Sequence, residues 1–198
     1  MALTYSTKVP LGSGTIDFSL PGTDGVNYSP SSFKSAEVLV IVFTCNHCPY
    51  AQAIWPRLID FQARFKDRGV QLVGINPNDA ANYPEDHPRE MKKKVKEWGI
   101  NFPYLFDESQ ETARAYDAQC TPDLYVYDRA RKLRYHGRLD DNWQDPAGAG
   151  GAGTWGAGGA DPAAVQRREL EEAVAALLAG RSPADRQNPS MGCSIKWK

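Results

Sequence analysis

The sequence predicts an α/β protein with a central mixed β-sheet and helices on both of its faces. An apolar, β-branched run over residues 38–43 is typical of a strand that is covered on both sides. Strand-type and helix-type segments then alternate along the chain as far as residue 106. Two further strand-type segments, 124–127 and 132–138, are joined by a tight turn at 128–131, which indicates an antiparallel hairpin.

Composition places the chain among ordinary globular proteins. Its 198 residues suffice for one domain, and its net charge of −1 provides no basic surplus for nucleic acid. No stretch reaches the roughly 18 apolar residues that cross a bilayer, and the first residues lack a basic, then apolar leader. We therefore expect a cytoplasmic protein with neither nucleic acid nor membrane as a partner.

The first half of the chain is predicted to hold a hairpin, a helix and two buried strands. Residues 16–20 and 26–28 flank a Pro-Gly turn and predict an N-terminal β-hairpin extension. Apolar residues recur at helical spacing over residues 48–67, where Pro56 predicts a kink. Gly69 ends this helix, and residues 70–75 form the next buried strand.

The second half is predicted to add three helices. Helix 89–98 ends at Gly99, and its lysine run is expected to be a solvated face. After a short strand at 104–106, Ser109 is predicted to cap a helix through residue 116. A final helix over residues 162–179 has a proline at its start and Gly180 just past its end.

One segment departs from the habits of compact domains. Residues 142–160 form a Gly/Ala-rich tract without periodicity. Trp143 and Trp155 either anchor this loop to the body, which we favour, or line a groove for a partner. We predict a single domain over residues 1–198, with a core at about 14–141 and 161–180 and a tail at 181–198. Ile195 and Trp197 are expected to pack back onto that core.

The candidate functional residues lie where the strand at 38–43 passes into the following helix. Cys45 and Cys48 form a C-x-x-C motif, a spacing that separates the Cα atoms by about 5–5.5 Å along a helix, within reach of a disulfide. The start of a helix offers unpaired N–H groups and a positive dipole end, which favour a thiolate at Cys45. Without a leader, four cysteines point to redox chemistry rather than to disulfide staples.

Four stretches give the chain a family resemblance. They are FTCNHCPYA at 43–51, CTPDLYVYD at 120–128, YHGRLDD at 135–141 and PSMGCSIKWK at 189–198. Together with the order of elements they resemble the thioredoxin superfamily, and within it the peroxiredoxin-like branch of the alkyl hydroperoxide reductase and thiol-specific antioxidant (redoxin) family. The resemblance implies a thioredoxin-like fold, an antioxidant or redox-homeostasis role and a cis-proline at Pro122 facing the dithiol.

The resemblance also implies roles for the motif. Cys45 would be the exposed nucleophile and Cys48 the buried resolving thiol, acting on protein or small-molecule disulfides with a thiol as electron donor. His47, with Asn46, would stabilise the reduced dithiol and place the pair in the more oxidising half of the range of about −270 to −120 mV. The alternative for His47 is a solvent-facing residue without coupling. We expect no bound cofactor.

Other residues have two interpretations each. Thr121 is either a plain strand start with Pro122 or a backbone edge that binds an extended substrate chain. Cys120 is either a buried hydrophobe or a third thiol near the site, and Cys193 either structural or a tail thiol that resolves an oxidised site cysteine. Catalytic roles are not favoured for the remaining candidates, which are His87, His136 and Asp60.

Two competing functions follow from the same motif. A thiol peroxidase would need P-x-x-x-T-x-x-C with a distant arginine such as Arg138, but Thr44 directly precedes Cys45, so its hydroxyl is misplaced. A zinc or copper module would use Cys45, Cys48 and His47, but the second half of such a site is missing as a motif. A redox-inert binding domain is disfavoured by the intact C-x-x-C.

Overall fold

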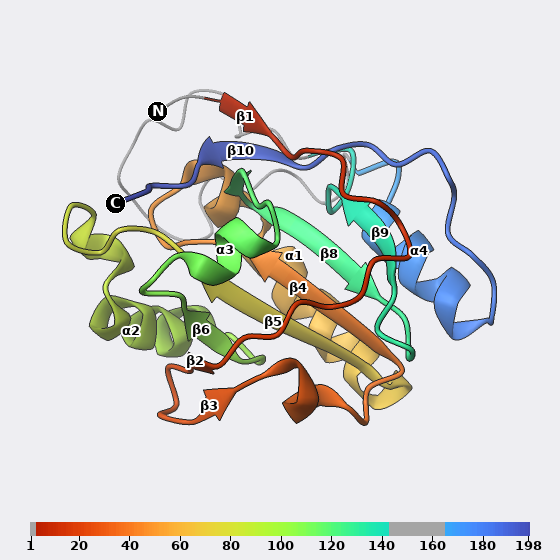
Figure 1. Ribbon diagram of the computed structural model, residues 1–198, viewed down its shortest axis with the longest axis horizontal. Helices are drawn as coiled ribbons and strands as arrows, with labels where there is room; N and C mark the ends of the chain where they lie inside the picture. Colours follow the sequence, from red (N-terminus) through yellow and green to blue (C-terminus); the bar gives the residue numbers. More distant parts are fainter. Residues whose placement is uncertain (1–2, 143–164) are drawn as a thin grey trace.

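The computed structural model describes residues 3–142 and 165–198, and its centre is a five-stranded mixed sheet (Figure 1). The strand order is β6-β5-β4-β8-β9. β4 pairs in parallel with β5 and β5 with β6, whereas β8 is antiparallel to both β4 and β9. The predicted mixed sheet and its terminal hairpin are therefore confirmed. The strands are β4 (Val38–Phe43), β5 (Val70–Asn76), β6 (Tyr104–Phe106), β8 (Asp123–Tyr127) and β9 (Leu133–Gly137).

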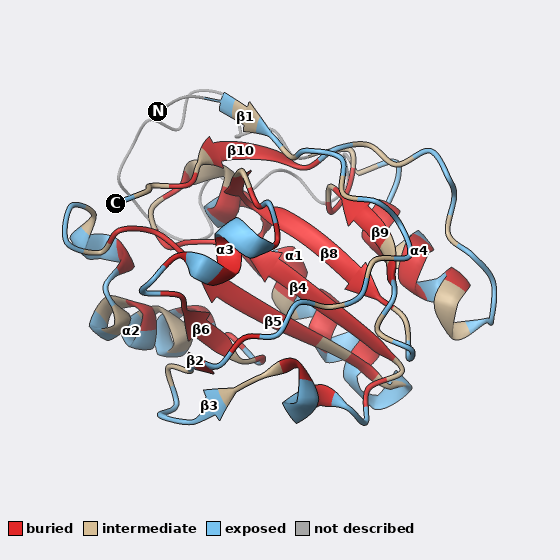
Figure 2. Ribbon diagram, in the orientation of Figure 1, coloured by how far each residue is buried: buried red, intermediate tan, exposed pale blue. Residues whose placement is uncertain are grey.

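Strand β4 is the middle of the core because all six of its side chains are buried. Alternate residues of a strand point to opposite faces, so its valines and its Leu39, Ile41 and Phe43 belong to two different hydrophobic clusters. The first cluster lies under helices α1 (Pro49–Phe65), α2 (Pro88–Trp98) and α4 (Glu169–Leu178), and the second under α3 (Glu111–Ala115), the N-terminal segment and Ile195. Figure 2 shows the strands of the central sheet as buried. Both faces are covered, as the continuous apolar run predicts.

In the part of the chain that the structure describes, the helices follow the predicted order but differ in some boundaries. They are α1 (Pro49–Phe65), α2 (Pro88–Trp98), α3 (Glu111–Ala115) and α4 (Glu169–Leu178). Gly99 ends α2 with a positive φ, as predicted, whereas α1 ends at Phe65 and Gly69 ends the 3₁₀ turn η2 (Lys66–Arg68) that follows it. The final helix begins at Glu169, and residues 165–168 are not helical. Gln110, rather than Ser109, occupies the N-cap of α3.

Short 3₁₀ turns and a small hairpin complete the connections. β2 (Leu20–Pro21) and β3 (Asn27–Tyr28) pair antiparallel, which confirms the N-terminal hairpin in a shorter form. The 3₁₀ turns are η1 (Pro30–Phe33), η2 (Lys66–Arg68) and η3 (Pro84–Asp86). Turn η3 is part of the Asn- and Pro-rich loop after β5. Its last residue, Asp86, reaches the candidate site.

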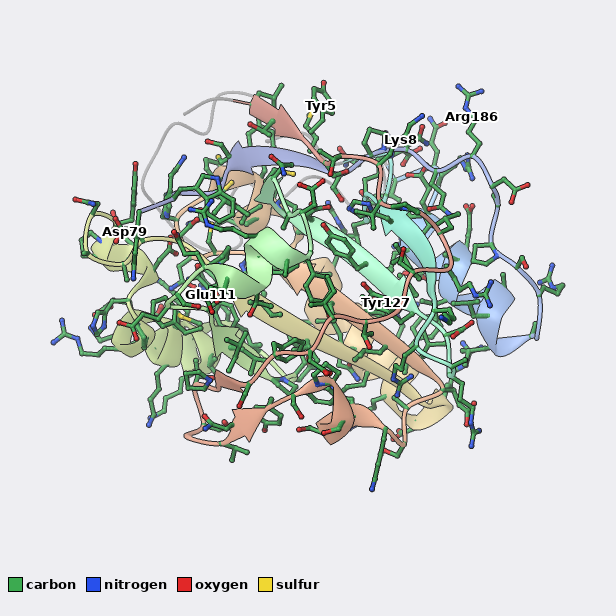
Figure 3. The ribbon with its side chains drawn as sticks, viewed as in Figure 1. Tyr5, Lys8, Asp79, Glu111, Tyr127 and Arg186 are labelled. Carbon is green, nitrogen blue, oxygen red and sulfur yellow. The ribbon has the colours of Figure 1, made fainter. Side chains whose placement is uncertain are left out.

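A second sheet was not predicted from the sequence. It consists of β1 (Leu3–Tyr5), β10 (Met191–Ser194) and β7 (Cys120–Thr121), all antiparallel, in the order β1-β10-β7. Figure 1 shows β10 between β1 and the start of α1, and Figure 3 shows Tyr5 pointing outward from β1. The two ends of the chain are thus joined in one small sheet. Strands as short as β1 and β10 are not stable alone and need partners from distant segments.

Ile195 and Trp197 pack against the second hydrophobic cluster, which confirms that the tail docks onto the body. Trp143, Trp155 and most of the Gly/Ala-rich tract lie outside the described residues, so their predicted anchoring role stays a prediction, as do the proposed domain limits. Within the described ranges, no helix is both long enough and apolar enough to span a membrane.

Candidate redox site

The C-x-x-C motif lies in the turn between β4 and α1, but the helix begins later than expected. Its first residue is Pro49, and Cys48 is the N-cap with an extended backbone. The expectation that Cys45 sits at the helix start is wrong, because a bend at Asn46 and His47 separates Cys45 from the helix. The unpaired N–H groups and the positive dipole end therefore face Cys48.

Both motif cysteines are buried, with exposed fractions of 0%. The expectation that Cys45 is an exposed nucleophile is therefore also wrong. The cause is the second sheet, because Thr121 of β7 and Cys193 of β10 lie directly against the two sulfurs. No disulfide joins any of the four cysteines, all of which lie in the described residues.

The electrostatics of the two thiols differ. Burial raises the pKa of Cys45 well above its usual range, and its hydrogen bond with Cys48 and the charge of Asp86 add to the effect. Burial alone would also raise the pKa of Cys48, but hydrogen bonds from the thiols of Cys193 and Cys45 and from the N–H of Ala51 reverse this and lower it well below its usual value. The structure thus favours a thiolate at Cys48.

Thr121 contacts both sulfurs of the motif. Its hydroxyl lies 3.3 Å from Cys45 Sγ, and its carbonyl oxygen accepts a hydrogen bond of 3.2 Å from the Cys48 thiol when that group is protonated. The Thr121–Pro122 peptide bond is cis, as the resemblance implies. The contacts of Thr121 place this cis X-Pro bond next to the dithiol, as the resemblance implies.

Asp86 is the site residue that sequence reasoning missed. It ends turn η3, is fully buried, and accepts hydrogen bonds from the backbone N–H of Asn46 (2.7 Å), from His47 Nδ1 (2.5 Å) and from Asn78 Nδ2 (2.8 Å). An aspartate among the polar residues of a loop carries no signal that separates it from a solvated one. The only available signal was the length of the loop, since long loops in compact domains are usually functional.

Asn46 and His47 are held by this carboxylate and its neighbours. The Asn46 side chain donates to Glu85 O (2.7 Å) and accepts from Tyr104 Oη (3.0 Å), so its role here is to fix the bend. His47 stacks on Tyr83 with ring centroids 5.2 Å apart, and its side chain is 14% exposed. His47 is therefore not the freely solvated residue of the alternative interpretation.

The same groups form the potential metal ligands of the site. One ligand atom each from Cys45, His47 and Asp86 lie within 4.8 Å of one another. This is a soft-to-borderline donor set of the kind that binds zinc. The hydrogen bond between His47 and Asp86 would have to be given up or rearranged for both to bind one ion.

We expect the stability that His47 contributes to depend on pH. Burial lowers the pKa of His47, but the hydrogen bond and charge of Asp86, with smaller effects from Cys48 and Glu85, outweigh it and raise the pKa overall. A raised folded-state pKa contributes stability fully below the unfolded value of about 6.5, and the contribution disappears as the pH rises through the folded value. The difference in unfolding free energy between wild type and His47→Gln should therefore be largest below about pH 6.5 and shrink as the pH rises above that value.

Urea unfolding under reducing conditions at several pH values measures this difference. Asp86→Asn provides the matched comparison, because it removes the charge that raises the His47 pKa and should flatten the profile in the same way. A difference that is constant with pH would contradict the coupling of His47 to Asp86.

The remaining candidate residues lie away from the two motif sulfurs or make structural contacts. Thr44 is buried, and its hydroxyl has no hydrogen-bond partner among the described residues. Cys120 is buried and donates toward Pro122 O (3.5 Å), and burial raises its pKa well above the usual range. His136 Nε2 lies 2.9 Å from Asp123 Oδ1, and Arg138 forms an ion pair with Glu169 of α4.

His87 and Asp60 lie on the surface. His87 is exposed and caps α2 by accepting from the N–H of Arg89 (3.1 Å). Asp60 pairs with Arg64 one turn further along α1 at 2.7 Å. Neither contacts the motif cysteines, so the low expectation of a catalytic role agrees with their positions.

A buried thiol pair between a central strand and a helix, facing a cis X-Pro bond on a neighbouring strand, defines a thioredoxin-like protein. Comparison with solved structures shows the same fold, including a putative thiol:disulfide interchange protein of Chlorobium tepidum (TM-score 0.56, 25% identity, 65% of this chain and 85% of the other). The model of the AhpC/TSA family matches residues 11–136. The chain belongs to the AhpC/TSA (redoxin) family and is an oxidoreductase of that group.

The relatives that match are named either as peroxiredoxins or as thiol–disulfide oxidoreductases. Peroxiredoxin Q of rice is 30% identical over 147 residues, covering 64% of this chain and 68% of the relative. An uncharacterized conserved protein of Geobacillus kaustophilus shares 42% identity across 100% of this chain and 97% of its own, with a TM-score of 0.86. The matches to peroxiredoxins and to thiol–disulfide oxidoreductases agree with the family but do not decide between the two reactions. That choice depends on the geometry of the site.

Proposed function

We propose that the protein is a thiol–disulfide oxidoreductase whose redox-active pair is Cys45 and Cys48. The observation that carries this proposal is that both sulfurs lie against Thr121 in one buried cluster at the start of α1. Their roles are assigned here by electrostatics: Cys48, which receives N–H and thiol donors, is the attacking thiolate, and Cys45 is the thiol that resolves. This reverses the roles implied by the resemblance.

In the first step the Cys48 thiolate attacks one sulfur of a substrate disulfide. The substrate S–S bond breaks, a mixed disulfide forms at Cys48, and the other substrate sulfur leaves as a thiolate. Donors around the Cys48 sulfur stabilise the thiolate before the attack, which requires that it be present at neutral pH.

In the second step Cys45 attacks the Cys48 sulfur and releases the second substrate sulfur. The result is a Cys45–Cys48 disulfide, and the two electrons of the dithiol end on the reduced substrate. Since the pKa of Cys45 is raised while it donates toward the Cys48 thiolate, formation of the mixed disulfide removes that charge and makes Cys45 easier to deprotonate. An external thiol donor then returns the pair to the reduced form.

The experiment is oxidation of the fully reduced protein with an excess of a small symmetrical disulfide, hydroxyethyl disulfide. Samples are quenched in acid, alkylated and digested without reduction for mass spectrometry. We expect one intramolecular disulfide per chain that includes Cys48. A chain in which Cys45 and Cys48 both remain open to alkylation after denaturation, at every time point, would overturn the proposal.

Two other functions predict different results with the same reduced protein. A thiol peroxidase would be oxidised by hydrogen peroxide far faster than a free thiol. Arg138 is held in an ion pair with Glu169 of α4, which supports the disulfide reaction over this one. The metal module, favoured only by the cluster of Cys45, His47 and Asp86, would retain stoichiometric zinc or copper after purification under reducing conditions.

A further inference from the structure

The C-terminal strand occupies the edge at which an extended substrate chain would bind. In β10, Cys193 is the register partner of Thr121 and Ser194 that of Cys120, in antiparallel pairing. Backbone addition to a strand edge is a common way to bind an extended peptide. The prediction that Thr121 offers such an edge to a substrate is therefore altered, because the chain's own tail takes that position.

The pairing brings a third sulfur to the dithiol. Cys193 is 2% exposed, packs in one cluster with Cys45, Cys48 and Ala51, and forms a thiol hydrogen bond with Cys48. Cys120, although it is next to Thr121, is not in this cluster. The site thus contains three thiols from two segments of the chain, the C-x-x-C turn and the tail strand, with Cys48 in contact with both of the others.

The close approach of the tail depends on Gly192. A Cβ at this position would lie 2.0 Å from the carbonyl oxygen of Thr121 and 2.6 Å from its carbonyl carbon. Both are backbone atoms, so no side chain can move aside to make room. Only glycine lets the strand come near enough to place the next residue, Cys193, against Cys48.

Contacts beyond Cys193 hold the strand in this register. Ile195 N donates to Gln119 O (3.1 Å), and the backbone of Lys196 exchanges hydrogen bonds with Asn78 Oδ1 and Asp79 N, both at 2.9 Å. The guanidinium of Arg114 lies 4.2 Å from the centre of the Trp197 ring. Cys193 is therefore fixed at the site by anchors on its C-terminal side as well as by the thiol contact.

We propose that Cys193 is a third redox-active thiol that forms a disulfide with Cys48. The proposal rests on the proposed function and extends it. In the oxidised protein, the Cys193 thiol attacks the Cys48 sulfur of the Cys45–Cys48 disulfide. The Cys45–Cys48 bond breaks, a Cys48–Cys193 bond forms, and the proton lost by Cys193 ends on Cys45. The exchange needs no further oxidant, because the number of disulfides is unchanged.

The exchange changes which cysteine an external thiol donor attacks. Cys45 is released by the exchange, while the disulfide moves to the one sulfur that belongs to the tail strand. Of the three sulfur-bearing residues, only Cys193 has any exposed fraction. The exchange thus moves the disulfide onto the tail strand, so that displacement of β10 alone would expose it to an external thiol.

The test uses tryptic peptides that the sequence makes favourable. Cys45 and Cys48 lie together in peptide 35–57, and Cys193 lies in peptide 187–196. In Cys45→Ser, a link between these two peptides can only be Cys48–Cys193. We expect hydroxyethyl disulfide to convert Cys45→Ser mainly into this linked pair, and Cys48→Ser to yield little of it. Cys120, in peptide 115–129, should stay alkylatable in both.

Results of the opposite kind would overturn the proposal. If oxidised Cys45→Ser carries only a mixed adduct with the reagent while Cys193 remains a free thiol, Cys193 is not redox-active. Thermal unfolding and circular dichroism identify a variant that fails to fold, and Cys45→Ala then replaces it. If wild type forms the Cys45–Cys48 disulfide but no variant forms the linked pair, this inference fails and the proposed function stands.

A second variant tests the geometry without altering a cysteine. Gly192→Ala should push β10 off Thr121, abolish the linked peptide pair and raise the alkylation rate of the site thiols in the native protein by about tenfold or more. Gly14→Ala is the matched control, because a Cβ there meets nothing within 4 Å. Equal linkage in Gly192→Ala and wild type would contradict the placement of Cys193 by the tail strand.

Discussion

Cys48→Ser should reduce turnover of a disulfide substrate on the order of 10³-fold or more, because it removes the nucleophile, a loss that reaches about 10⁶ in other enzymes. The serine hydroxyl does not ionise near neutral pH, so the donors around position 48 have no thiolate to stabilise. The fold should be retained, since a hydroxyl can accept the N–H of Ala51 at the helix start. Turnover of hydroxyethyl disulfide with a thiol donor provides the measurement.

Cys45→Ser distinguishes the two roles. It should lose turnover but keep the first attack, so that a mixed disulfide accumulates at Cys48 when Cys193 is also replaced by serine. Cys120→Ala is the matched control, because Cys120 is equally buried but lies outside the cluster of the three thiols. If Cys48→Ser traps the adduct and Cys45→Ser does not, then the roles are those of the family resemblance.

Asp86→Ala should lower the free energy of unfolding by about 3–5 kcal/mol, as expected when one partner of a buried polar pair is removed. The change leaves the Asn46 N–H, the Asn78 amide and His47 Nδ1 without their acceptor in a buried region. This is a large share of a total stability that is typically about 5–15 kcal/mol. Urea unfolding in the presence of reductant measures it.

Two comparisons sharpen this prediction. Asp60→Ala removes an aspartate that is also paired with a cation, but its side chain is 61% exposed, so it should cost only a small part of that loss. Asp86→Asn keeps the shape and part of the hydrogen bonding, so it should fall between the two. A loss for Asp86→Ala no larger than that for Asp60→Ala would show that the carboxylate does not hold the bend together.

Local patterns were sufficient for the elements that carry their own signal. The buried run at 38–43 became β4 without change, and Gly99 ended α2 where predicted. The first residues of helices were harder to predict: a C-x-x-C followed by helical spacing does not say whether the turn begins at the first or the second cysteine. Pro49 settles it, since proline at the first helical position leaves Cys48 as the N-cap.

The tail illustrates a different limit. Residues 191–194 are too few and too weakly apolar to indicate a strand by themselves, and their partners lie at residues 3–5 and 120–121. A strand of this kind exists only when distant segments supply its hydrogen bonds. The same holds for Asp86, whose burial is created by Asn46, His47 and Asn78 after the chain has folded.

By itself the sequence determined the α/β class, the redoxin family and the two thiols at the end of a buried strand, because apolar periodicity and short motifs are local properties. Only the tertiary structure decided which sulfur meets the helix start, which carboxylate faces His47, and that a third thiol closes over the pair. These depend on contacts between residues about 40 to 145 positions apart, where pKa values are set by burial and by hydrogen bonds that no neighbouring residue reveals.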